Sequence, residues 1–192
     1  MAQVFDARNA KLTRNDRILV DTNVALDLAS TLGGSSREMR QRDYSQFVQR
    51  VRSAGGELII SVLSFLEISN RIERQRACDD LGRTDANNLE LKRHRRVSID
   101  FRRRVAAEIE FVWSELRSYM TVLEADISSG EPERSYLGSF QTGVLDAFDI
   151  ALLFESKRSN ISSIVTHDGD FASAPIVVFT ANERMIREAG RY

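Results

Sequence analysis

Six acidic side chains stand at or near the ends of apolar segments, where they could serve metal-dependent chemistry. They are Asp21, Glu67, Asp146, Asp149, Asp168 and Asp170. Asp21 follows the apolar run 18–20, which is typical of a buried strand, although so short a run does not exclude a buried helix. Asp168 comes just after a second predicted strand, at 162–166. Ligands of open α/β sheets bind at the carboxyl ends of the strands, so both acids are expected at a ligand-binding edge.

The other acids belong to helical patterns. Asp146 and Asp149 are three residues apart, so a helix over 144–157 carries both on one face. Like charges at this spacing repel mildly, which favours a cation between them. Glu67 lies among apolar residues, and a buried acid there needs a partner. Oxygen ligands suit Mg²⁺ or Mn²⁺ better than zinc, and such a site can activate water and promote displacement at phosphorus.

Each acid also has a purely structural explanation. Asp21 can cap a following helix, and Glu67 completes a Ser-x-x-Glu capping box, although Ser61 is an equally good cap. Asp146 near a helix start favours the helix dipole. Asp168 is followed by glycine, which is ordinary turn chemistry. The combination of acids, rather than any single one, favours a metal site.

The elements that must position these acids alternate between strands and helices. The predicted strands cover residues 17–20, 57–61, 121–125, 162–166 and 175–180. Helices are predicted between them, including a long amphipathic helix over 98–120 with apolar residues at steps of three and four. This alternation predicts a three-layer α/β/α fold with a central, mostly parallel sheet. We expect a polar leader at 1–16 and one domain over 17–192, with a helical insertion around 77–120.

The composition excludes several classes of protein. The chain has 192 residues and a net charge of −1, so it has no global attraction to nucleic acid or to a membrane. Cys78 is the single cysteine, and His94 and His167 are the two histidines, so an intramolecular disulfide is impossible and a structural zinc site is not expected. No secretory signal, membrane-spanning run or phosphate-binding glycine loop is present, and we expect a cytoplasmic protein.

One local cluster of positive charge offers a nucleic-acid contact. It comprises Lys92, Arg93, Arg95 and Arg96, followed by further arginines at 102–104. Such a cluster can bind an RNA backbone or an acidic partner protein. It is equally well explained as the solvated face of a helix.

Taken in order, the acidic motifs resemble those of the PIN-domain ribonucleases, a family that includes VapC-type toxins. The matching segments are Ile-Leu-Val-Asp21-Thr-Asn, Glu67 on a helix, Asp146-Ala-Phe-Asp-Ile-Ala and Val-Thr166-His-Asp168-Gly-Asp-Phe. The resemblance implies that Asp21, Glu67, Asp146 and Asp168 are catalytic acids that bind Mg²⁺ or Mn²⁺. It assigns auxiliary roles to Thr166, Asp149, Asp170 and Asn23.

The resemblance also implies a function and partners. The expected function is metal-dependent endoribonuclease activity, as the toxin of a toxin–antitoxin pair, with an RNA substrate, a cognate antitoxin protein and a homodimeric state. Two alternatives stay open: a PIN-like module that binds RNA or protein without cleaving, and a metal-dependent phosphatase. The phosphatase is weaker, because Asp21-Thr-Asn lacks the second acid of an Asp-x-Asp motif. The chain also departs from small family toxins in its extra length, mainly between residues 71 and 136.

Overall fold

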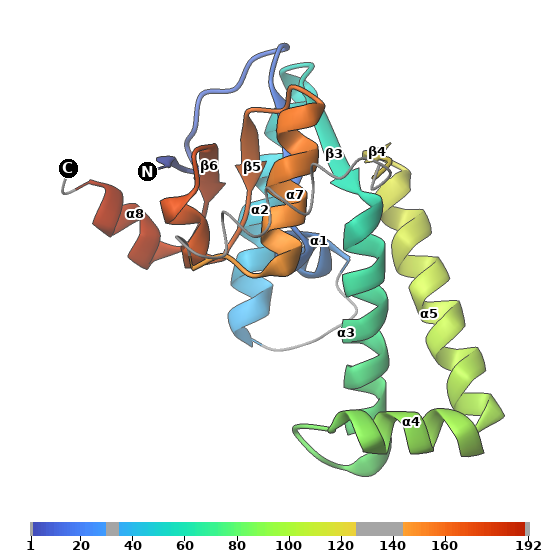
Figure 1. Ribbon diagram of the computed structural model, residues 1–192. Helices are drawn as coiled ribbons and strands as arrows, with labels where there is room; N and C mark the ends of the chain where they lie inside the picture. Colours follow the sequence, from blue (N-terminus) through green and yellow to red (C-terminus); the bar gives the residue numbers. More distant parts are fainter. Residues whose placement is uncertain (1, 30–34, 126–143, 191–192) are drawn as a thin grey trace.

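The fold is built on a six-stranded parallel sheet, seen in a computed structural model that describes residues 2–29, 35–125 and 144–190 (Figure 1). The strands are β1 (Gln3–Asp6), β2 (Arg17–Val20), β3 (Glu57–Ser61), β4 (Thr121–Leu123), β5 (Ser163–Val165) and β6 (Val177–Thr180). Their spatial order is β1-β6-β5-β2-β3-β4, and every neighbouring pair is parallel.

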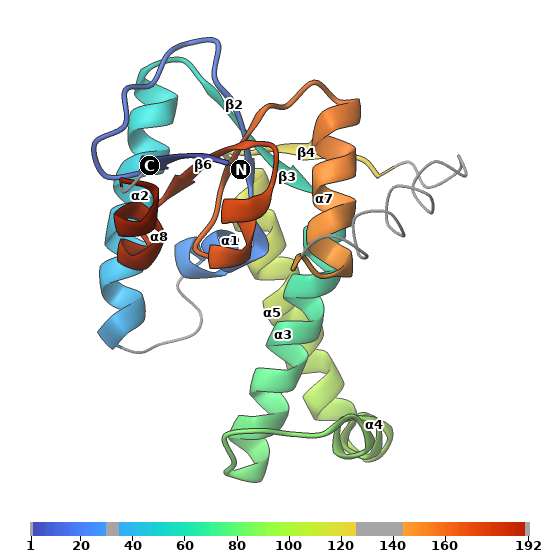
Figure 2. The same ribbon diagram turned by 60° about the vertical axis from the view of Figure 1, so that its left-hand side comes forward.

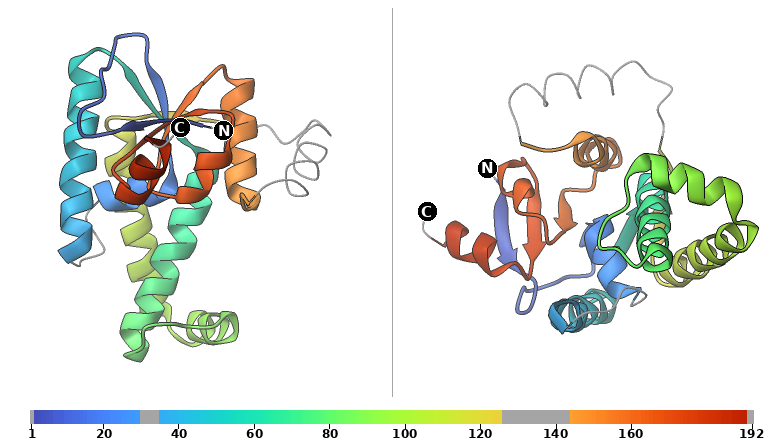
Figure 3. Two further views of the ribbon diagram at one scale, coloured as in Figure 1. Left: turned by 90° about the vertical axis from the view of Figure 1, so that its left-hand side faces the viewer. Right: turned by 90° about the horizontal axis from the view of Figure 1, so that it is seen from below.

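Helices cover both faces of this sheet (Figure 3). They are α1 (Thr22–Leu28), α2 (Ser35–Ser53), α3 (Val62–Leu81), α4 (Asn88–Val97), α5 (Ile99–Arg117), α7 (Ala147–Arg158), the 3₁₀ helix η1 (Gly169–Ser173) and α8 (Glu183–Ala189). Residues of α1, α2, α3 and α5 share one apolar core, and residues of α7, η1 and α8 share another. The predicted three-layer α/β/α fold is therefore confirmed.

The central strand β2 shows why the sheet needs both layers. Ile18 and Val20 point into the core under α1 and α2, whereas Leu19 points into the core under α7. All three side chains are fully buried. Successive side chains of a strand face opposite sides, so a continuous apolar run has both faces covered, as is usual in parallel sheets.

Beside β2, the direction in which successive strands are added to the sheet reverses. The chain runs from β2 to β3 and β4 on one side, and later returns to place β5 and β6 on the other. The carboxyl ends of β2 and β5 therefore meet at the topological switch point of the sheet, which is the usual ligand-binding crevice of open α/β folds. Asp21 directly follows β2, and Thr166 directly follows β5.

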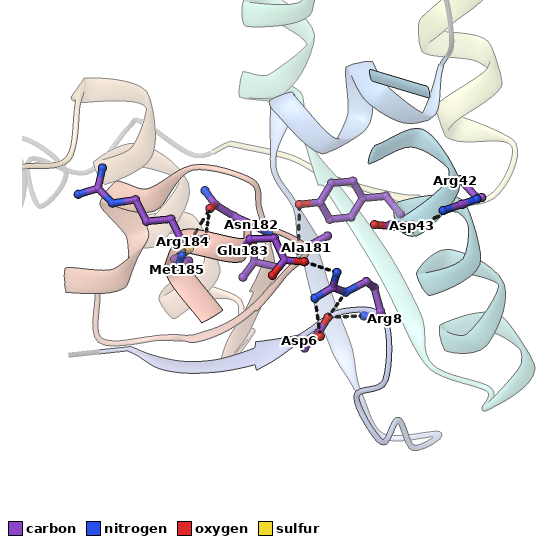
Figure 4. Close-up of polar contacts among 11 residues, drawn as sticks. Asp6, Arg8, Arg42, Asp43, Ala181, Asn182, Glu183, Arg184 and Met185 are labelled. Carbon is purple, nitrogen blue, oxygen red and sulfur yellow. Dashed lines mark hydrogen bonds and ion pairs between the residues drawn. The ribbon is translucent and has the colours of Figure 1, made fainter. Parts of the chain in front are cut away.

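The first residues of the chain belong to the sheet, in contrast to the predicted leader over 1–16. Residues 3–6 form β1 and pair with β6 along their whole length. Arg8 then donates to Asp6 at 2.8 Å and contacts Glu183 at the start of α8 (Figure 4). The sequence signal was weak because β1 is a half-buried edge strand with no continuous apolar run.

Three helices form an arm that projects from the sheet layers (Figures 1 and 2). The outer parts of α3 and α5 run side by side, and α4 crosses their far end. The arm has a small core of its own, made of Ala77, Cys78, Ala86, Leu91, Phe101 and Val105. The predicted insertion around 77–120 falls on this arm, although α5 also reaches the main core through Val112 and Leu116.

Candidate active site

Asp21 lies at the carboxyl end of β2 and also caps α1. Its side chain is buried, and its Oδ1 accepts a hydrogen bond of 2.6 Å from the backbone N–H of Thr22. Its Oδ2 accepts hydrogen bonds from the Thr166 hydroxyl at 2.6 Å and from the side-chain amide of Asn23. Asp21 therefore acts as a helix cap and also lies at the ligand-binding edge of the sheet.

Burial and neighbouring acids make the Asp21 carboxylate costly to ionise. Removal from water raises its pKa to about 6, and the charges of Glu67 and Asp168 act in the same direction. The hydrogen bond from Thr166 opposes the rise, because it stabilises the ionised form. A cation beside Asp21 would relieve this repulsion.

The loop after β5 is tied to Asp21 by side chains that had been predicted to be auxiliary. The Thr166 hydroxyl accepts from the N–H of Asp168 at 2.9 Å, and Asn23 accepts from the N–H of His167 at 3.0 Å. Thr166 is fully buried. The two residues thus hold Asp21 and the Asp168 backbone in a fixed relation across the switch point.

Asp168 also has the predicted turn function, since its Oδ1 accepts from the N–H of Asp170 at 3.0 Å and caps η1. Asp170 is exposed.

The acids of α7 are arranged differently from the predicted helical pair. Asp146 precedes the helix as its N-cap and accepts from the N–H groups of Phe148 and Asp149 at 2.8 and 3.0 Å. Asp149 returns the contact by accepting from the Asp146 N–H at 3.3 Å, which completes a capping box. Burial, followed by the charge of Asp146 and more weakly those of Asp21 and Asp168, raises the pKa of Asp149 to about 7. Asp149 is therefore electrostatically coupled to the same edge of the sheet.

Glu67 lies in the second turn of α3, because Ser61 rather than Ser64 caps the helix. The hydroxyl of Ser61 accepts from the Leu63 N–H at 3.1 Å. One oxygen of Glu67 accepts from Nε and Nη2 of Arg71 at 2.9 and 2.6 Å. Glu67 thus has an ion-pair partner one turn further along α3.

The set of acids fits a divalent cation in its chemistry and charge. All candidate ligands are carboxylates, and Asp21 and Asp149 are coupled to each other and to Asp168. Their side chains do not form a ready coordination cage: within 2–29, 35–125 and 144–190, no group of three or more His, Cys, Asp or Glu residues is placed to hold a metal. Mg²⁺ commonly keeps several waters and takes only one or two carboxylates directly, so it does not require three protein ligands.

A polar cleft of about 400 Å³ adjoins Asp168. It is lined by Asn23, Leu26, Asp27, Arg40, Arg71, His167, Asp168 and Gly169. Asp27 and Arg40 form a pair in which Nε lies 3.2 Å from a carboxylate oxygen. The sequence reasoning missed this pair, although an acid inside the apolar helix segment Ala-Leu-Asp27-Leu was a signal for a buried partner.

His167 is fixed at the wall of this cleft by a tyrosine from α2. The hydroxyl of the fully buried Tyr44 lies 2.8 Å from His167 Nδ1 and accepts from the N–H of Ala181 at 3.2 Å. Burial lowers the pKa of His167, and the charge of Arg40 adds to this effect, so folding favours the neutral ring. Nothing in the local sequence around Tyr44 predicts this contact with a residue 123 positions away.

The basic cluster lies on α4, at the far end of the arm. Arg95 donates two hydrogen bonds of 2.6 Å to Glu73, which supports the view of this face as a solvated, ion-paired one. Lys92, Arg93 and Arg96 are exposed. The cluster is thus separated from the acidic edge by the length of the arm (Figure 1).

An apolar groove of about 860 Å³ lies between α3 and α5. Phe65 and Trp113 line it in an edge-to-face contact with ring centroids 5.2 Å apart. Nearby on the same two helices, Leu66 and Phe111 are 56% and 61% exposed. None of the described helices has the length and apolar character needed to cross a membrane.

Comparison with known proteins finds a distant structural likeness. No family model matches the chain, and no curated protein matches it. The crystal structure of FitAcB from Neisseria gonorrhoeae is similar at 15% sequence identity and a TM-score of 0.44, with 86% of this chain and 99% of that chain covered. A likeness this distant carries no weight for function, which rests on the residues and geometry above.

Proposed function

We propose that this protein is a PIN-like endoribonuclease that uses Mg²⁺ or Mn²⁺ to cleave RNA phosphodiester bonds. The observation that carries the proposal is the coupling of acids from separate segments at the switch point of the sheet, where burial and mutual repulsion raise the pKa values of Asp21 and Asp149. Such a cluster favours a cation, and the ordered motifs resemble those of the ribonuclease family.

In this proposal Asp21, Glu67, Asp146 and Asp168 hold the cation, directly or through water. When bound, the cation supplies an activated water and stabilises the charge that develops at phosphorus. Thr166 and Asn23 fix the Asp21 carboxylate, as the hydrogen bonds to its Oδ2 indicate. Asp149 contributes negative charge beside Asp146, and Asp170 at the exposed turn contributes least.

Cleavage of a single-stranded RNA of mixed sequence tests the proposal. Loss of an outer-shell metal partner typically costs about 10–100-fold in activity or affinity, so Asp21→Asn should reduce Mn²⁺-dependent cleavage by at least about 100-fold. Glu57→Gln is the matched control, because Glu57 pairs with Arg17 at the opposite end of the strands. RNA bound but never cut by the wild type would favour the non-cleaving module. Hydrolysis of a phosphate monoester instead of RNA would favour the phosphatase.

We further propose that the protein acts as the toxin of a toxin–antitoxin pair, in the cytoplasm, and that it forms a homodimer. The resemblance of its motifs implies this role, and the apolar groove between α3 and α5 offers a surface for a protein partner. Expression of the protein should arrest growth, and co-expression of the product of the neighbouring gene should restore it. Growth arrest that also occurs with Asp21→Asn would show a cause other than cleavage.

The basic cluster is proposed as an accessory RNA contact. Reversal of Lys92, Arg93 and Arg96 to Glu should weaken RNA binding for all sequences alike and flatten its salt dependence, since phosphate contacts release counterions. Arg95 is left in place because it is paired with Glu73. An unchanged salt slope would assign α4 to the solvated surface.

A further inference from the structure

The polar cleft is continuous with the candidate active site. Its walls come from α1, α2, α3 and the loop after β5, and its lining includes both Asn23 and Asp168. Asn23 donates to Asp21, while Asp168 stands at the end of the hydrogen-bonded loop that holds Asp21. A polymer bound at these acids would therefore extend into the cleft.

Arg40 enters this cleft from α2 and is anchored on one side. Its Nη2 lies 3.3 Å from one oxygen of Asp27 and its Nε 3.2 Å from the other. The Asp27 side chain is only 6% exposed, whereas that of Arg40 is 33% exposed. A guanidinium carries five N–H donors, so donors remain for a ligand after the contacts with Asp27 are made.

Arg71 enters the same cleft from α3 and is anchored in a similar way. Its Nε and Nη2 donate to one oxygen of Glu67, and its side chain is 52% exposed. An anchored guanidinium loses less conformational freedom when it binds a ligand, and its planar fork matches the oxygens of a phosphate group. Two such groups thus line one cleft beside a cluster of acids.

We propose that this cleft binds the phosphate of the RNA nucleotide next to the cleavage point, with Arg40 and Arg71 as the phosphate contacts. The inference rests on the proposed ribonuclease function and adds the means by which the substrate is held. A phosphodiester chain that approaches Asp21 and Asp168 meets negative charge. The two guanidinium groups line the cleft that Asp168 also lines, where they offset this repulsion.

Binding of a short fluorescein-labelled single-stranded RNA tests the inference, with Ca²⁺ in place of Mg²⁺ and with gel analysis to show that the RNA stays intact. Arg71→Gln should weaken binding about tenfold and lower the salt slope by about 1, as expected when one phosphate contact is lost. For Arg40, the double variant Asp27→Asn/Arg40→Gln avoids a buried unpaired carboxylate. Arg17→Gln is the control, since Arg17 is exposed and paired with Glu57 at the far edge of the sheet.

The expected result is weaker RNA binding in both cleft variants, at unchanged melting temperature, and wild-type binding in Arg17→Gln. Should the double variant fail to fold, Arg71→Gln decides alone. Wild-type affinity and salt slope in the folded cleft variants, while the wild type cleaves RNA, would overturn the phosphate site but leave the ribonuclease function standing. A wild type that neither binds nor cleaves RNA would overturn both the phosphate site and the ribonuclease function. Binding of polyglutamate, an acidic polypeptide, in place of RNA would do the same.

Discussion

At the scale of single residues, Asp21 shows how a structural role and a chemical role can share one side chain. Its Oδ1 caps α1, and its Oδ2 accepts from Thr166 and Asn23. The cap fixes the rotamer, so the carboxylate is held in place before any ligand arrives. The energetic cost of this arrangement is the buried charge, which raises the pKa of Asp21 to about 6.

This cost predicts a pH dependence of the metal-free protein. A carboxyl group whose pKa is raised by folding favours the folded state at low pH. That contribution is fully present below 3.8, the ordinary value, and is lost as the pH rises through about 6. Asn cannot ionise, so Asp21→Asn lacks this loss. In EDTA the variant should therefore gain about 2 kcal/mol of stability relative to the wild type between pH 4.5 and pH 8.

The measurement is urea unfolding of both proteins at the two pH values. The quantity to compare is the difference in free energy of unfolding between the two proteins, because His167 also titrates in both. Folding lowers the pKa of His167, so the stability that His167 contributes is lost as the pH falls. A stability difference that stays constant with pH would show that the fold does not perturb Asp21.

At this scale the sequence predicted the positions of the acids better than their contacts. The strand-end location of Asp21 follows from an apolar run that stops at a polar residue, and Thr166 and Asn23 follow from the same motifs. The sequence predicted Asp146 to lie inside a helix, whereas in the structure that helix begins at the next residue. The Asp27–Arg40 pair and the Tyr44–His167 contact depend on packing between distant segments, which local spacing does not encode.

At the scale of elements, the start of α7 combines a cap with a candidate ligand, and two substitutions separate these roles. Asn is as good an N-cap as Asp, whereas Ala is a poor one. Asp146→Asn should therefore leave the stability of the metal-free protein nearly unchanged, and Asp146→Ala should lower it by about 1 kcal/mol. Both should lose Mn²⁺-dependent RNA cleavage. Cleavage retained in Asp146→Asn but lost in Asp146→Ala would show that the residue acts through the cap alone.

The helical arm depends on its own small core. Phe101 is 1% exposed there and packs edge-to-face against His94 with ring centroids 4.5 Å apart. Phe101→Ala should destabilise the arm by about 3–5 kcal/mol, which hydrogen exchange of α4 and α5 amides would detect. Phe111→Ala on the same helix is the control, because that side chain is 61% exposed and its loss should change stability by less than about 0.5 kcal/mol. Equal protection of α4 in both variants would contradict a separate arm core.

At the scale of the whole molecule, the layers were predictable and the strand order was not. Alternating strands and helices predict a parallel sheet with two helical layers whichever strands are neighbours. The pairing of β2 with β5 joins residues such as Leu19 and Ile164, and nothing in either strand selects that partner. β1 was not predicted, because an edge strand needs only one covered face and therefore lacks a continuous apolar run.

The edge position of β1 gives a prediction for the whole sheet. Deletion of residues 2–6 should expose the backbone of β6, and an uncovered strand edge promotes pairing between molecules. We expect the shortened protein to aggregate on warming at a lower temperature than the wild type, as measured by light scattering. Arg8→Gln, which weakens the link to Asp6 but keeps the strand, should have a smaller effect. Deletion without added scattering would show that β6 is protected by other means.

The pairing of early strands with late ones also sets when the proposed active site can form during synthesis of the chain. Asp21 and Glu67 lie within the first 67 residues of the chain, but Thr166 and Asp168 are made near its end, and β5 must insert beside β2 before they meet. Synthesis proceeds at about 5–20 residues per second, so for several seconds the nascent chain carries half of its acids without the other half. Both sides of the α3–α5 groove are complete by residue 118, so a partner that recognised this groove would have the time between the synthesis of residues 118 and 168 in which to bind.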